Sequence, residues 1–145
     1  MSKLILILST SLLLSGFKMS DMQNVPIIIR SKKATFNKIY DTMSFEGKVK
    51  INFAQYIILT EKMITYRYNK NNQSILEKID FPENVKLVKK DESEVIFLPN
   101  AKYNAKKKII QSKGEIYLEK NDDLFKTNSI LIELGDVENI SLPSF

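Results

Sequence analysis

Apolar and polar residues alternate with a period of two along most of the chain after residue 25. In residues 47–53, Val49, Ile51 and Phe53 alternate with Lys48, Lys50 and Asn52. Shorter stretches follow the same rule at residues 64–68, 85–87, 116–118 and 130–134. This period is typical of strands that bury one face. The pattern therefore predicts an all-β protein, built as a sandwich, barrel or rolled sheet, without a long helix.

Short polar clusters separate these apolar stretches. Residues 69–72, 89–93 and 120–123 are rich in Asn, Asp, Lys and Ser, which favour turns. We predict hairpin tips at all three places. Only four Gly and four Pro occur, so the strands between the tips should be long.

A weak internal repeat supports a modular sheet. The segments Gly47-Lys48-Val49, Glu83-Asn84-Val85 and Gly114-Glu115-Ile116 each open an alternating strand. Each is followed by a second expected strand, at residues 57–68, 95–103 and 129–134. Three β-hairpin modules of this kind would have to stack, because a single hairpin cannot bury its own apolar face.

The N-terminus has the order of a secretory signal. Lys3 precedes an apolar run at residues 4–14, and the small residues Ser15 and Gly16 follow. We predict a signal peptide at residues 1–16 and a single domain at residues 17–145. Because a Leu stands where signal peptidase prefers a small residue, an uncleaved anchor stays open as an alternative. The chain has no Cys to acylate, which excludes a lipoprotein.

Composition removes most enzyme classes. Without His or Cys there is no Ser-His-Asp triad, no cysteine nucleophile, no disulfide and none of the usual zinc or copper ligands. The carboxylate clusters, Asp91, Glu92 and Glu94 in one and Asp122 and Asp123 in the other, fall on predicted hairpin tips, where solvent leaves acids unperturbed. We therefore predict no catalytic residue, no metal site and no cofactor.

The net charge of +5 reflects an excess of Lys, densest at Lys102, residues 106–108 and Lys113. A solvated face accounts for such a patch better than a nucleic-acid site. The aromatic side chains fall mostly on the apolar side of their strands, which indicates core rather than a platform for bases. Export also argues against a nucleic-acid partner.

Taken together, the export signal, the opening at residues 26–37 and the strand at residues 43–51 resemble the LptA/OstA-like family of periplasmic bridge proteins. In that family an extended segment with a small-residue box precedes a Gly-Asn-Val strand, here Gly47-Lys48-Val49. The segment at residues 59–66 is similar to the family's return strand. The Asp common in the small-residue box is absent from residues 31–34. The resemblance covers residues 27–134.

The resemblance implies a twisted, partly open antiparallel β-jelly roll in the periplasm, which carries lipopolysaccharide from the inner to the outer membrane. Protomers would join head to tail, and also contact the membrane subunits, through edge strands at residues 27–36 and 129–134. Acyl chains of lipid A would lie in a groove formed by the inward side chains Val49, Ile51, Phe53, Ile64, Tyr66, Val85, Leu87, Phe97, Ile116, Leu118, Ile130 and Ile132. Two alternatives stay open: the membrane-anchored subunit of the same pathway, and a β-sheet assembly module with an ordinary closed core.

Overall fold

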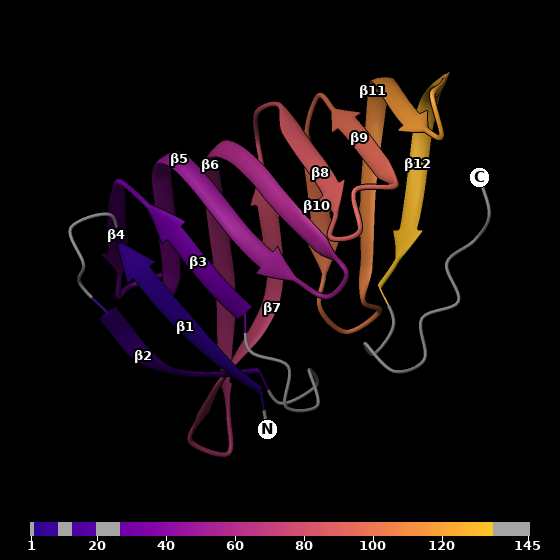
Figure 1. Cartoon of the computed structure of the whole chain (residues 1–145). Coiled ribbons are helices and arrows are strands. Elements are labelled where there is room, and N and C mark those ends of the chain that lie inside the picture. Colours follow the sequence, from indigo (N-terminus) through magenta and orange to yellow (C-terminus); the bar gives the residue numbers. More distant parts are fainter. Residues whose placement is uncertain (1, 9–12, 20–26, 135–145) are drawn as a thin grey trace.

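The computed structural model describes residues 2–8, 13–19 and 27–134, and within these ranges the chain is all β (Figure 1). The strands of the first half are β1 (Ser2–Leu8), β2 (Leu13–Met19), β3 (Ile27–Ser31), β4 (Lys33–Asn37), β5 (Thr42–Phe53) and β6 (Tyr56–Lys70). Those of the second half are β7 (Gln73–Phe81), β8 (Val85–Lys89), β9 (Glu94–Leu98), β10 (Ala101–Asn104), β11 (Ile109–Lys120) and β12 (Asp123–Glu133). All pairings are antiparallel except that of β1 with β3.

Long bent strands fold the sheet into two layers. The first half of β5 pairs with β4, and its second half pairs with β3. Likewise β6 pairs with β8 through residues 56–60 and with β7 through residues 64–70, while β11 pairs with β10 in its first half and β9 in its second. Each of these strands therefore belongs to both layers.

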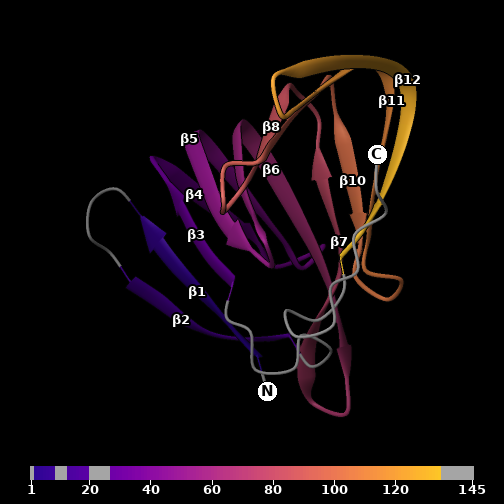
Figure 2. The ribbon, with the colours of Figure 1, turned by 45° about the vertical axis from the view of Figure 1, so that its right-hand side comes forward.

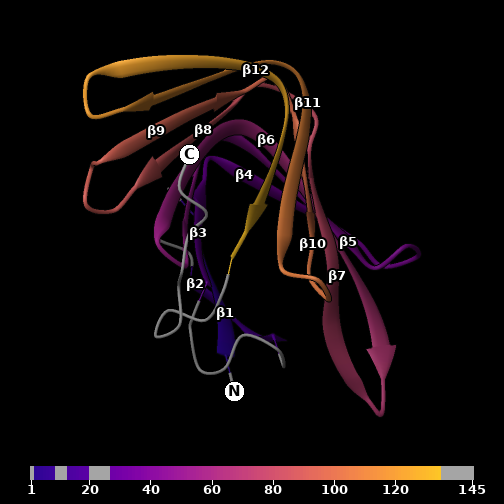
Figure 3. The same ribbon diagram turned by 90° about the vertical axis from the view of Figure 1, so that its right-hand side faces the viewer.

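We call the two layers the first sheet and the second sheet. The first sheet contains β4, β7 and β10 with the adjoining halves of β5, β6, β11 and β12. The second contains β1, β2, β3, β8 and β9 with the other halves of the same long strands. The layers meet along the bends and diverge toward the opposite side, as the turned views show (Figures 2 and 3).

The sequence repeat marks the places where the chain passes from the first sheet to the second. In β5 and β11 a β-bulge lies at the bend, with Gly47 at φ +81° and Gly114 at φ +127°. In the middle module the passage is a loop at residues 82–84, and the return lies at Pro99 and Asn100. Proline cannot donate to a sheet ladder, so Pro82 and Pro99 break what are continuous strands elsewhere.

These findings confirm the antiparallel β-jelly roll built from hairpin modules and the three predicted tips. Other strand boundaries differ from those expected. Residues 27–36 form two strands, since β3 and β4 are separated at Lys32 and pair with different halves of β5. Residues 95–103 also form two strands, β9 and β10, because of Pro99. The last strand begins at Asp123, six residues before the expected start at Ser129.

One apolar cluster fills the space between the sheets. It takes Ile27 and Ile29 from β3, and an edge contact joins the rings of Phe53 and Tyr103, whose centroids lie 4.9 Å apart at 82°. Phe53 belongs to the second sheet and Tyr103 to the first, so this pair links the two layers. Aromatic pairs in this geometry contribute about 0.5–1.5 kcal/mol beyond their buried area.

Candidate functional site: the interior between the two sheets

The inward faces of both sheets are apolar, and alternation in β5, β8 and β11 is the reason. Eight of the twelve predicted groove residues have an exposed fraction of 4% or less; these are Val49, Ile51, Phe53, Val85, Leu87, Ile116, Leu118 and Ile132. A ninth, Ile130, is partly buried and packs against the same cluster. The structure thus brings nine predicted residues from four strands into one interior.

Ile64, Tyr66 and Phe97 do not face this interior. In β6 the buried side chains are Tyr56, Ile58 and Thr60, then Met63 and Thr65, so the inward face changes from even to odd residues at the bend. Ile64 and Tyr66 follow the bend and therefore point outward.

Phe97 lies between the buried Ile96 and Leu98 of β9 and is 36% exposed. The ammonium groups of Lys78 and Lys86 lie 4.5 and 5.6 Å from the ring centroids of Tyr66 and Phe97, which marks both rings as outer-face side chains.

Several interior residues were not predicted from the sequence. In the first sheet these are Met63, Ile79, Tyr103 and Ile110, and in the second Tyr56, Ile58, Ile96 and Leu98. Residues 56–59 and 95–98 are continuous apolar runs, so periodicity alone does not tell which face is buried. Once the bends are known, counting alternate residues from the nearest bend assigns each of these side chains to the inward or outward face.

In this structure the interior is closed by its own side chains. Ile51, Ile58 and Ile116 have exposed fractions of 1% or less. Two hollows of about 440 and 420 Å³ lie along Leu59 and Asn84, next to the outward side chains Lys50 and Lys86. An acyl chain could enter the interior only if the two sheets moved apart.

A polar group closes the interior at one end of the second sheet. Glu94 is 2% exposed; its Oε2 accepts a hydrogen bond from the hydroxyl of Tyr56 (3.4 Å), and its Oε1 lies 3.5 Å from Nζ of Lys120. Burial, together with the charge of Glu94, raises the pKa of the Tyr56 phenol above its ordinary range, so the hydroxyl stays a donor. The sequence grouped Glu94 with solvated turn acids, and its burial corrects that expectation. Alternation places it on the inward face with Ile96.

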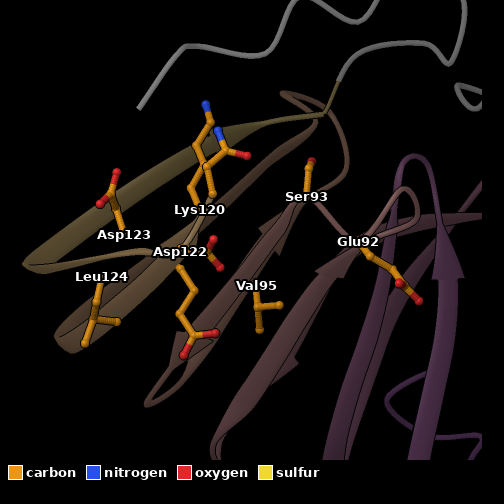
Figure 4. A pocket seen from close by; sticks show the side chains of 9 residues that line it. Glu92, Ser93, Val95, Lys120, Asp122, Asp123 and Leu124 are labelled. Atoms are coloured by element: carbon orange, nitrogen blue, oxygen red, sulfur yellow. The ribbon is translucent and has the colours of Figure 1, made fainter.

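The other acids of these tips are exposed, as expected. Figure 4 shows Glu92, Asp122 and Asp123 around a surface hollow of about 400 Å³ between the β8–β9 and β11–β12 tips. Asp91 accepts hydrogen bonds from the backbone N–H and hydroxyl of Ser93, and these bonds lower the pKa of its carboxyl. Within the described residues, no three His, Cys, Asp or Glu side chains gather closely enough to hold a metal ion.

The described ranges also contain no helix long and apolar enough to span a membrane. Of the basic residues singled out in the sequence, Lys106, Lys107 and Lys108 lie in the turn that joins β10 to β11, Lys102 lies on β10, and Lys113 lies at the bend of β11. Among them Lys102, Lys106, Lys107 and Lys113 are exposed, and none lines the interior.

No family model matches this chain. A curated relative, an uncharacterized protein RP507 of Rickettsia prowazekii (strain Madrid E), is 23% identical over 103 residues, which is 71% of each chain. Among solved structures, LptH of Pseudomonas aeruginosa matches with a TM-score of 0.59 and 11% identity over 75% of this chain and 76% of its own. LptH is described as the LptA-homologous periplasmic component of the conserved lipopolysaccharide transport device. This protein therefore has the LptA-like β-jelly-roll fold.

Proposed function

We propose that this protein is an exported carrier that holds the acyl chains of lipopolysaccharide between its two sheets and bridges inner to outer membrane. The observation that carries the proposal is an apolar interior that is not sealed by strand pairing. Both inward faces are apolar, and among the described residues no backbone pairing links the strand ends of the first sheet to those of the second on the side away from the bends. The shared fold with LptH supports the same function and a periplasmic location.

The physical chemistry of the interior suits an acyl chain. Each methylene withdrawn from water contributes about 0.8 kcal/mol, so a chain of about twelve carbons gains about 10 kcal/mol. Side chains such as Ile51 and Leu87 would exchange their contacts with neighbouring side chains for contacts with the acyl chain, and they would stay out of water. The bends hold the sheets together on one side, so we propose that they separate on the other.

A matched pair on β5 tests the groove. Ile51 is fully buried, and its neighbour Lys50 is exposed on the opposite face of the strand. A photo-crosslinking residue at 51 should trap lipopolysaccharide, and the same residue at 50 should not. Equal capture at both positions would refute the assigned face.

Substitution gives a second readout. Ile51→Asp should abolish uptake of a fluorescent acyl probe, whereas Lys50→Asp should leave it intact. Circular dichroism must accompany the first variant, because a buried Asp also threatens the fold. If Ile51→Asp stays folded and takes up the probe normally, the interior is not the lipid site and the assembly-module alternative gains.

We also propose head-to-tail assembly through sheet edges, both between copies and with the membrane subunits. In the described residues β12 pairs only with β11, and β4 only with β5, so each has a free edge that can recruit another strand. β1 covers the edge of β3. Cleavage after residue 16, as the signal peptide predicts, would remove β1 and uncover that edge. The alternative to assembly is that β3 or β12 is capped by the tail at residues 135–145, which lies outside the described residues.

Light scattering over a concentration series should show mass that grows with concentration for the processed protein. Leu131→Pro removes a backbone donor from β12 and should lower that mass. Strict monomer behaviour with and without lipid would refute assembly. Intact mass of the exported protein decides between carrier and anchored subunit: a chain starting at Met1 in the membrane fraction would favour the anchored subunit.

A further inference from the structure

The turn between β4 and β5 presents two apolar side chains to solvent. Ile39 is 86% exposed and Tyr40 is 73% exposed, while buried apolar side chains fill the interior a few residues away at Met43 and Phe45. Single exposed apolar side chains are ordinary, but two consecutive ones at the tip of a turn form a small convex apolar knob. We call residues 38–40, with Lys38 beside the pair, the apolar tip.

The apolar tip is held firmly from both sides. On one side, Oδ1 of Asn37 accepts hydrogen bonds from the backbone N–H groups of Ile39 (3.0 Å) and Tyr40 (3.3 Å). On the other, Asp41 binds Nη2 of Arg67 at 2.8 Å, and its carbonyl accepts the Arg67 N–H at 3.2 Å. The Arg67 guanidinium also lies 5.2 Å from the Phe36 ring centroid. The two apolar side chains are therefore pre-positioned outside the fold, which lowers the entropy lost on docking.

Positive charge gathers at the same end of the first sheet. The β4–β5 turn, the β6–β7 tip and the β10–β11 turn all lie there, because their strands are neighbours in register (Figure 3). They carry Lys38, Lys70, Lys106 and Lys107, and in the described part of the chain no carboxylate lies within ion-pair distance of these four ammonium groups. Asp41 is neutralised by Arg67.

The carboxylates of the second sheet's tips lie at the other end of the molecule, where Glu92, Asp122 and Asp123 surround the hollow of Figure 4. Lys89, Lys90 and Lys120 stand at the same tips, so this end carries mixed charge, whereas the first end carries an apolar tip surrounded by lysines. A partner that selects the first end must offer negative charge and accept a convex apolar knob.

We propose that the apolar tip docks this protein on an anionic lipid surface. Ile39 and Tyr40 would enter the headgroup region, where aromatic side chains are favoured, and the lysines of the three turns would meet lipid phosphates. A lipid surface fits these turns better than a protein pocket, because the cations are spread around a protruding knob rather than along a concave wall. The association is weak and reversible, since only two side chains insert.

Vesicle flotation tests the proposal with the protein as it is exported. Wild type should float with vesicles of phosphatidylglycerol and phosphatidylcholine, and much less with phosphatidylcholine alone. Lys38→Ser should weaken partitioning about fivefold, as expected for one lysine near an anionic surface. The double variant Ile39→Asn, Tyr40→Ser should lose most binding with an unchanged melting curve, because neither side chain supports the core.

A matched control sits at the opposite end, at the β11–β12 tip, where Leu124 is 64% exposed. Leu124→Asn should float like the wild type. The chain has no Trp, so Ile39→Trp and Leu124→Trp each introduce a single tryptophan, whose emission can be excited selectively. Emission should shift to the blue on adding anionic vesicles for the first and not for the second.

Equal flotation of wild type and the double variant, or no emission shift at position 39, would overturn the proposal. Both results are expected if the apolar tip binds a protein and not a lipid surface. Uptake of a soluble acyl probe by the double variant should stay normal. Loss of vesicle docking is thereby distinguished from failure of the interior lipid site.

Discussion

Two bends carry strands from the first sheet to the second, and they are built differently. In β5 two consecutive residues, Gly47 and Lys48, have positive φ angles of 81° and 46°. In β11 Gly114 alone makes the bend, at φ +127°, a conformation that is essentially restricted to glycine. The same change of sheet is therefore spread over two residues in β5 and concentrated in one in β11.

The neighbouring segments explain why the bends differ. Beside the β5 bend, the N–H of Lys32 donates to the Gly47 carbonyl at 3.0 Å, and the Lys48 N–H donates to Oε2 of Glu61 at 3.2 Å. Beside the β11 bend stands Pro99, which has no N–H to offer.

Side chains take over at the β11 bend: Nδ2 of Asn100 donates to the Lys113 carbonyl at 3.3 Å, and the Ser112 hydroxyl donates to the Asn100 carbonyl at 2.6 Å. A proline at a sheet corner thus shifts hydrogen bonding from the backbone to polar side chains.

The largest effect should come from Gly114→Ala. A Cβ there would lie 2.9 Å from Cγ of Pro99, and the backbone strain is added to that contact. We expect the free energy of unfolding to fall by about 2–4 kcal/mol, measured by urea denaturation. Lys113→Ala, one residue earlier and exposed, should change it by less than about 0.5 kcal/mol. Equal stability of the two variants would mean that the β11 bend is not strained.

Gly47→Ala should have a smaller effect. Its φ lies closer to the left-handed region that other residues tolerate, and the nearest atoms to an added Cβ, at 3.0 Å, belong to the Lys32 side chain. We expect a loss of about 1–2 kcal/mol in the same urea experiment. A loss larger than that of Gly114→Ala would reverse the comparison between the bends.

The bends also explain which parts of the fold could be predicted from the sequence. Alternation at residues 47–53 correctly placed Val49, Ile51 and Phe53 on one face, because β5 stays within the second sheet after its bend. Gly47 and Gly114 were interpreted as the starts of strands. They lie inside long strands, since a glycine at a turn and a glycine at a bulge look alike in a sequence.

The same limit applies to the interior. Alternation was extended to Ile64 and Tyr66 without allowance for the bend at residues 61–62, and a shift of one residue exchanges the two faces of a strand. The burial of Glu94 was also missed, because its partners Tyr56 and Lys120 come from strands distant in sequence. Which distant strands lie beside each other is information that one sequence read along its length does not contain.

The smallest predicted effect concerns charge at the β11 bend. Glu115 follows Gly114; its Oε1 accepts the Tyr117 hydroxyl at 2.5 Å and lies 3.1 Å from Nζ of Lys126 on β12. The hydrogen bond from Tyr117, and then the ammonium of Lys126, lower the pKa of the Glu115 carboxyl below its ordinary value of 4.5, and the same contacts raise the pKa values of Tyr117 and Lys126. All three groups are exposed, so the effect on stability is slight and falls with salt.

A group with a lowered pKa in the folded state stabilises the fold above its unfolded pKa, and this contribution disappears as the pH falls through the folded value. We therefore expect the NMR titration midpoint of Glu115 to lie below 4.5. Tyr117→Phe and Lys126→Ala should each raise that midpoint, because each removes a contact that lowers the pKa of the Glu115 carboxyl. Lys126 acts through a hydrogen bond and also through its charge, and salt screens the charge, so added salt should raise the midpoint more in Tyr117→Phe than in Lys126→Ala. An unchanged midpoint in Tyr117→Phe would show that the ion pair with Lys126, rather than the tyrosine hydroxyl, holds the carboxylate at the β11 bend.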